Sequence, residues 1–416
     1  MNKSLQSILS RAISIVSKFL LLTFLAKILS LSDYGAYQLI TYFTMIAISI
    51  YGVEYYMYGN REIAKGDNSI TKINNHISFF ITLFPLTFLL QIIALFFLVP
   101  TEILSVQVFV IIVFVNFCDY FNQEVYRYLI MVKKISQANL LLIAKSSIFL
   151  VLIVSCYLIN ETIDLDITLR IMFVSFIILL IITSLFLFKY IIRFKDINFK
   201  ILNRKELKKT MSFLFPFVIL MFFTKGLEFF DKFAIEYFYD TKHVGVYSFL
   251  FSIASLIHVF VVSGFYLVFL PELIGLNEER NKKIKKELVR FSALVLSSSL
   301  ILSIVIIIFI DILLEIIGKA DLIENINILY ILLSAFFFLN LSLIPGIILY
   351  IKGKDRLLMY ISGIVLIVNV TFNLIFLKLF NLEGAAIALS ITHFINFIIM
   401  SYKANTIWKK MKRNFL

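Results

Sequence analysis

The chain has 416 residues, of which 61% are hydrophobic and 16% are charged, and its formal net charge is +13. Soluble domains are about half apolar and about a quarter charged, so this composition excludes an ordinary water-soluble protein. The two cysteines, Cys118 and Cys156, are isolated in apolar runs. Neither a disulfide framework nor a CxxC metal site is available to them.

Apolar windows of about 20 residues, the length that crosses a bilayer, recur along the whole chain. The first window contains Lys18 and Lys27 and is followed by no small-residue cleavage site, so we interpret it as a spanning helix and not as a signal peptide. Hydropathy and turn residues predict helices at residues 12–30, 36–59, 76–99, 103–126, 138–159, 168–191, 211–236, 246–269, 289–314, 326–350, 357–379 and 384–407.

The charges alternate between the two ends of these helices. If the N-terminus is cytoplasmic, most of the 39 Lys and Arg residues fall in cytoplasmic segments, above all in 189–209 and 280–290. The opposite loops are short and contain acidic residues such as Glu102, Asp164 and Asp321. This is the positive-inside pattern, which predicts that both termini are cytoplasmic. The basic excess therefore indicates membrane topology and anionic lipid neighbours, and no nucleic-acid motif accompanies it.

Two turns recur in the second half of the chain. Leu29–Tyr37 follows the first predicted helix, and Asp240–Tyr247 follows the seventh, roughly 210 residues later. In the same way Leu129–Lys134 corresponds to Leu349–Lys354. An even number of spans returns the chain to its starting side, so these repeats predict two six-helix halves in the same orientation.

The order and spacing of several short motifs resemble the multidrug/oligosaccharidyl-lipid/polysaccharide (MOP) exporter superfamily. Within it, the chain is most similar to the O-antigen and capsule repeat-unit flippases of the Wzx type. The supporting stretches are Leu25–Leu29, Tyr34–Tyr37, Phe215–Phe217, Asp231–Ile235, Gly245–Tyr247, Leu270–Leu273 and Leu382–Ala388.

The resemblance implies an all-α integral membrane protein of about twelve transmembrane helices in a MATE-like fold. Its two six-helix lobes, residues 1–205 and 206–416, would enclose a central cavity. The expected function is the flipping of oligosaccharide units on polyprenyl pyrophosphate across a bacterial cytoplasmic (inner) membrane by alternating access, for O-antigen (lipopolysaccharide) or capsule synthesis.

The resemblance also bears on partners and energy supply. We expect a transporter and not an enzyme, acting as a monomer among membrane lipids and alongside polysaccharide assembly proteins. No GxxxxGK[ST] phosphate loop is present, so ATP coupling is not predicted. Coupling to H⁺ or Na⁺ is open, and no cofactor, metal site or catalytic residue is predicted.

The seventh predicted helix contains four charged residues within eight positions: Lys225, Glu228, Asp231 and Lys232. Charges within a membrane usually face a wet cavity or each other. The spacings of three and four place most of the set on one helical face. Two interpretations are open: the charges neutralise one another within the helix, or they handle substrate or ions.

Lys18 lies in the middle of the first predicted helix, and the repeat offset places it opposite Glu228. We hypothesise that Lys18 and Lys225 present positive charge to the pyrophosphate. Glu228 and Asp231 would hold these lysines in the empty cavity or exchange a proton. The alternative for Lys18 is that its ammonium group extends to the membrane interface.

The fourth predicted helix carries a polar stripe of Asn116, Asp119 and Gln123, which is typical of a face that points inward. Glu54, at the end of the second helix, is a second candidate, with Arg61 as its expected partner. Lys145 is near the cytoplasmic end of its helix and is interpreted as an interfacial lysine.

Two other classes of function are weighed. A membrane glycan polymerase or glycosyltransferase would need an acidic pair or an Arg cluster in a long outer loop, and the outer loops here are short. A drug antiporter of the same superfamily would need a mainly acidic cavity, which the mixture of Lys and acidic residues disfavours.

Overall fold

The computed structural model of the chain describes residues 3–56, 69–159, 162–193, 196–198, 200–274 and 281–413. In these ranges the regular secondary structure is entirely helical, so the predicted all-α fold is confirmed. The helices of the first part are α1 (Lys3–Ile28), α2 (Leu31–Gly52), α4 (Ser69–Leu98), α5 (Val106–Met131), α6 (Ile135–Ile159) and α7 (Leu165–Tyr190). Those of the second part are α8 (Arg204–Phe238), α9 (Thr241–Val261), α10 (Leu267–Ile274), α11 (Asn281–Ile317), α12 (Ile326–Ile351), α13 (Asp355–Phe380) and α14 (Glu383–Arg413).

Eleven spans in the described ranges are long and apolar enough to cross a membrane. One of them runs from α9 through a π-helical segment, Val262–Tyr266, into α10. The long helix α2 is not among the eleven. The orientation of the termini stays a prediction.

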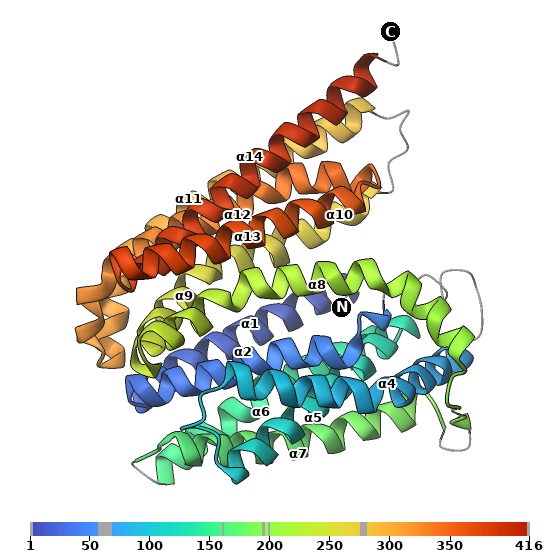
Figure 1. Ribbon diagram of the computed structural model, residues 1–416, viewed down its shortest axis with the longest axis horizontal. Coiled ribbons are helices and arrows are strands. Elements are labelled where there is room, and N and C mark those ends of the chain that lie inside the picture. The colour runs from blue at the N-terminus through green and yellow to red at the C-terminus, as the bar shows by residue number, and fades with distance from the viewer. Residues whose placement is uncertain are drawn as a thin grey trace. The chain divides into compact units, whose positions relative to one another are not determined.

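The chain divides into two compact units, Met1–Met221 and Phe222–Leu416, and the division lies within α8. In the N-terminal unit α1 packs on α6, α5 on α7, and α2 on both α4 and α5. In the C-terminal unit α12 packs on α9 and α14, and α13 packs on α14. Figure 1 shows α12, α13 and α14 as neighbouring orange and red ribbons.

The repeated turn before α2 and α9 has the same capping arrangement in both units. The side chain of Ser30 accepts a hydrogen bond from the backbone N–H of Asp33, at 3.0 Å. The side chain of Asp240 accepts one from the backbone N–H of His243, at 2.9 Å. Each cap satisfies one of the N–H groups that a helix start leaves without a partner.

The second repeated turn closes α5 and α12 in the same way. In the first copy the N–H of Lys134 bonds to the carbonyl of Leu129, at 2.8 Å, and in the second the N–H of Lys354 bonds to Leu349, at 3.0 Å. Lys133 and Gly353 occupy the left-handed position of these turns, with φ of 61° and 62°. The same sequence motif therefore forms the same helix end twice.

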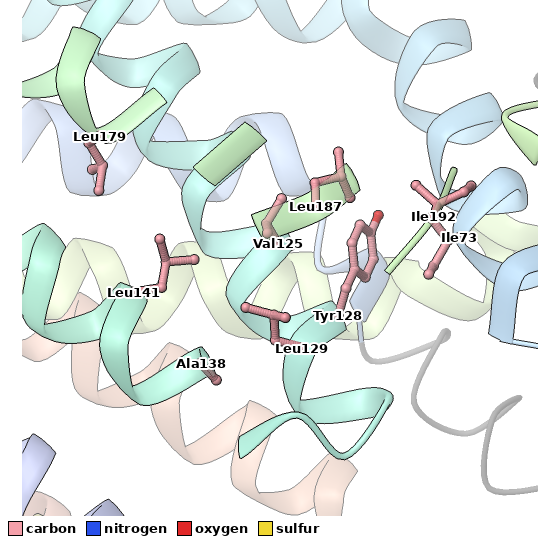
Figure 2. Close-up of a cluster of buried hydrophobic side chains, with 9 residues drawn as sticks. All are labelled: Ile73, Val125, Tyr128, Leu129, Ala138, Leu141, Leu179, Leu187 and Ile192. Atoms are coloured by element: carbon pink, nitrogen blue, oxygen red, sulfur yellow. The ribbon is translucent and has the colours of Figure 1, made fainter. Parts of the chain in front are cut away.

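A buried apolar cluster joins four helices of the N-terminal unit (Figure 2). It contains Ile73, Val125, Tyr128, Leu129, Ala138, Leu141, Leu179, Leu187 and Ile192. These side chains come from α4, α5, α6 and α7 and from the segment after α7. Because α5 contributes three of them, its polar residues are fixed against α4, α6 and α7.

In the C-terminal unit two glycines leave room for side chains packed between α8 and α13. A Cβ atom on Gly363 would lie 2.8 Å from the ring of Phe223, and one on Gly226 would lie 3.0 Å from Leu366. Small residues allow such close helix contacts within membranes. This contact fixes the part of α8 that carries Lys225 and Glu228.

Candidate functional site

An ion pair joins two helices of the N-terminal unit. Asp119 of α5 pairs with Lys145 of α6, and their side chains are 10% and 28% exposed. Lys18 of α1 interacts electrostatically with both groups. The hydroxyls of Ser17 and Ser147, 3.2 Å apart, connect α1 to α6 beside them. Two lysines and one carboxylate therefore lie near one another on membrane-spanning helices.

The polar stripe predicted on α5 faces inward in part. Asn116 is fully buried and Asp119 is buried, whereas Gln123 is half-buried. Among the described residues, neither amide atom of Asn116 has a hydrogen-bond partner. Asn122, which the prediction did not include, donates a hydrogen bond to Thr183 of α7, at 2.8 Å.

A second buried network connects α4 and α5 one to two turns further along. The Nδ1 of His76 lies 2.5 Å from the hydroxyl of Tyr128, and its Nε2 lies 3.3 Å from the hydroxyl of Tyr120. Glu124 lies 3.6 Å from His76 and pairs with Arg127. Reasoning from the sequence missed His76 and Glu124, because Glu124 falls at the end of an apolar helix and its partner is 48 positions away in the chain.

Glu54 lies at the margin of this network. It interacts electrostatically with Tyr56 and Glu124, and Arg127 stacks over the Tyr56 ring at 3.8 Å. Both Val53 and Glu54 have a positive φ, of 43° and 53°, which turns the chain sharply after α2. The expected partner of Glu54, Arg61, is outside the described residues.

The four charged residues of α8 form two separate ion pairs. Lys225 pairs with Glu228 at 2.8 Å, and these side chains are 28% and 47% exposed. Lys232 pairs with Asp231 at 2.8 Å, and both are completely buried. The Asp231 carboxylate also accepts a hydrogen bond from Tyr247, at 2.6 Å, and the Lys232 ammonium lies 3.4 Å from the centre of the Phe251 ring.

The two pairs on α8 therefore differ in what they can do. Asp231 and Lys232 are enclosed by α9 side chains and stabilise the packing of α8 on α9. Lys225 and Glu228 are partly exposed. The hypothesis that Lys18 and Lys225 face one cavity concerns both units and stays a prediction.

A hydrogen-bonded chain of polar side chains crosses the C-terminal unit. His258 of α9 lies 2.7 Å from the Oδ1 of Asn340 in α12, and Asn340 donates a hydrogen bond to Ser299 of α11, at 3.1 Å. Asn340 and Ser299 are fully buried. This chain satisfies buried polar groups, which is its structural role.

Metal-ligating side chains do not gather in the described part of the chain: no group of three or more His, Cys, Asp or Glu residues there could hold an ion. A small pocket does lie at the His76 network, lined by Tyr55, Tyr56, Lys72, His76, Glu124, Arg127, Tyr128 and Met131. The cluster of Lys18, Asp119 and Lys145 combines two lysines with one carboxylate.

Residues 2–274 match the family described as polysaccharide biosynthesis protein. The chain belongs to this family. A comparison with curated protein sequences found no significant match. The family match includes α1 to α10 and therefore all the charged clusters described above, apart from the residues that α11 and α12 contribute to the His258 chain.

Solved structures with the same fold are transporters and a flippase. An inward-facing multidrug resistance MATE family transporter of the MOP superfamily has a TM-score of 0.76 and 15% identity, covering 97% of this chain and 96% of that one. The lipid II flippase MurJ, in an inward closed conformation, has a TM-score of 0.70 and 16% identity, covering 97% and 87%. A Vibrio cholerae MATE transporter has a TM-score of 0.60 and 13% identity, covering 98% and 97%.

The family match and these likenesses confirm two predictions. The fold is MATE-like, and the resemblance to the MOP superfamily that the short motifs indicated is correct.

Proposed function

We propose that this protein is a flippase that moves polyprenyl-pyrophosphate-linked oligosaccharide units across a bacterial cytoplasmic membrane, for O-antigen or capsule synthesis. The observation that carries the proposal is the Asp119–Lys145 ion pair, with Lys18 in electrostatic range of both groups, in a membrane protein of the polysaccharide biosynthesis family. The diphosphate is the one strongly anionic group of such a substrate, and two ammonium groups complement it.

The charge of the site explains why a lysine pair suits a flippase. A charge near the bilayer centre costs about 2.5 to 3.5 kcal/mol on insertion scales, so an excess cation there needs an anion or water. Lysine binds phosphate as a point charge and without the fixed two-pronged geometry of arginine. Such a contact holds a diphosphate while leaving it free to turn during translocation.

The substrate must be released as well as bound. Alternating access of the two six-helix lobes would expose the diphosphate first to the cytoplasm and then to the outer face, and the saccharide supply or an H⁺ or Na⁺ gradient would drive the cycle. The protein acts on membrane-embedded substrate as a monomer, in contact with other polysaccharide assembly proteins.

Deletion of the gene tests the proposal in cells. We expect polyprenyl-linked repeat units to accumulate on the cytoplasmic side while surface glycan is lost, and plasmid-encoded wild-type protein to reverse both effects. Accumulation of translocated but unpolymerised units would instead identify a polymerase. Unchanged glycan together with increased sensitivity to cationic drugs would identify an antiporter.

A further inference from the structure

The ion pairs of the two units differ in a way that suggests different roles. The Asp231–Lys232 pair is completely buried, accepts a hydrogen bond from Tyr247 and lies against the Phe251 ring. Each charge of that pair has a fixed partner, and a ligand cannot reach it without unpacking α8 from α9. It is a structural pair.

The Asp119–Lys145 pair is open on one side. Lys145 is 28% exposed, and the Lys18 side chain is exposed beside it. Lys18 interacts electrostatically with both members of the pair, so two lysines lie near a single carboxylate. One helical turn before Asp119, the fully buried amide of Asn116 lacks a hydrogen-bond partner among the described residues.

We propose that Asp119 is a displaceable counter-ion that competes with the substrate diphosphate for Lys145. This inference rests on the proposed function and adds to it a residue that controls release. In the empty protein Asp119 holds Lys145. When substrate arrives, the diphosphate bridges Lys18 and Lys145, and Asp119 reclaims Lys145 as the substrate leaves.

The physical reason is a balance between binding and turnover. Two unpaired lysines in a membrane site of low dielectric constant would hold a diphosphate tightly and release it slowly. A carboxylate on a rigid neighbouring helix is a competing anion at fixed high local concentration. This carboxylate weakens binding of the substrate diphosphate to the lysines and lowers the barrier to its release.

The test is the affinity of the purified full-length protein for inorganic pyrophosphate, measured by calorimetry. The protein is held in nanodiscs of zwitterionic lipid at pH 6.5 and low salt, which limits screening of the charges. Because Asp119→Asn removes the competitor, we expect about tenfold tighter binding. Asp119→Glu keeps the charge and should bind as the wild type does. Lys145→Gln should weaken pyrophosphate binding about tenfold, both in the wild-type protein and in the Asp119→Asn variant.

Asp166→Asn is the matched control, because this substitution removes the same charge as Asp119→Asn. Asp166 pairs with Arg170 at the exposed start of α7, away from the cluster's ion pair. Its affinity should not change. If Asp119→Asn fails to tighten binding, or if Asp166→Asn tightens it equally, the counter-ion role is wrong. If Asp119→Asn does not fold, Lys18→Gln decides. This exposed change should remove the preference for pyrophosphate over orthophosphate, and an unchanged preference would overturn the bridging geometry.

The same variants separate binding from transport. In cells, Asp119→Asn should reduce surface glycan even though pyrophosphate binds more tightly, which a purely structural role would not produce. Nanodiscs with phosphatidylglycerol distinguish a lipid headgroup from the diphosphate: complete loss of pyrophosphate binding would make the cluster an anionic-lipid site and overturn the inference. Failure of wild-type protein to bind pyrophosphate in any lipid would count against the proposed function itself.

Discussion

Asp119 of α5 and Lys145 of α6 form an ion pair between two helices of the N-terminal unit, and Lys18 of α1 lies within electrostatic range of both. A second charged pair, Asp231 and Lys232, is completely buried between α8 and α9. In the first pair the Lys145 side chain is 28% exposed, whereas both side chains of the second pair are completely buried. The two therefore respond differently to mutation.

Lys145→Gln is expected to lower surface glycan about tenfold and to remove the ion-pair partner of Asp119. The double change Asp119→Asn/Lys145→Gln should recover the thermal stability that the single change loses, but not the transport. Immunoblots of surface glycan and fluorescence-detected thermal melts measure the two effects. Lys189→Gln, on the exposed end of α7, is the control and should keep normal glycan levels. Recovery of transport in the double variant would show that the lysine has no direct role.

Lys232→Met should destabilise the protein by about 3 to 5 kcal/mol, because it leaves the fully buried Asp231 carboxylate without its cation. Lys225→Met is the matched control on the same helix, where both partners are partly exposed, and should cost about 1 kcal/mol or less. Thermal unfolding in detergent compares them. Equal losses of stability would contradict the distinction between the closed and the open pair.

Gly384→Ala should prevent normal folding or cost about 2 kcal/mol or more. A Cβ atom at this position would lie 2.0 Å from the backbone oxygen of Phe376, so the turn between α13 and α14 would have to open. Gly264→Ala is the control, since a Cβ atom there would meet nothing within 4 Å. The yield of monodisperse protein measures the effect, and wild-type yield from Gly384→Ala would refute the predicted clash.

Lys133→Gly should raise stability by up to about 1 kcal/mol, because glycine adopts a positive φ without the cost that a lysine side chain imposes. Gly353→Ala, at the equivalent position of the second repeat, should lower stability by a similar amount. The neighbouring change Lys134→Gly removes a lysine where φ is not positive and should bring no gain. Chemical denaturation would detect the opposite signs, and destabilisation by Lys133→Gly would contradict this interpretation of the turn.

The sequence predicted the apolar centres of the helices well and their polar ends poorly. For α12 the predicted range 326–350 agrees with the observed helix, Ile326–Ile351. For α8 the prediction of 211–236 begins too late, since the helix spans Arg204–Phe238. For α11 the prediction of 289–314 also begins too late, since the helix spans Asn281–Ile317. Both misses are at basic N-terminal turns. Hydropathy detects only the part of a helix that lies in hydrocarbon, and these turns continue the helix as charged residues.

The candidate site shows the same division between local and tertiary information. Asp119 could be chosen from its spacing to Asn116, because neighbours on a helix are visible in the sequence. Its partner Lys145 was interpreted as an interfacial lysine, since the contact depends on how α5 packs beside α6. Tertiary contacts of this kind have no signature in a single sequence.

The most direct test of the proposed function is transbilayer movement of a fluorescent polyprenyl-pyrophosphate-linked saccharide in proteoliposomes. Dithionite quenching reports the lipid that reaches the outer leaflet. We expect wild-type protein and Lys189→Gln to accelerate this movement, and Lys18→Gln/Lys145→Gln to reduce it to about the rate of protein-free liposomes. A wild-type rate equal to that of protein-free liposomes, or a double variant as fast as the wild type, would contradict the proposal.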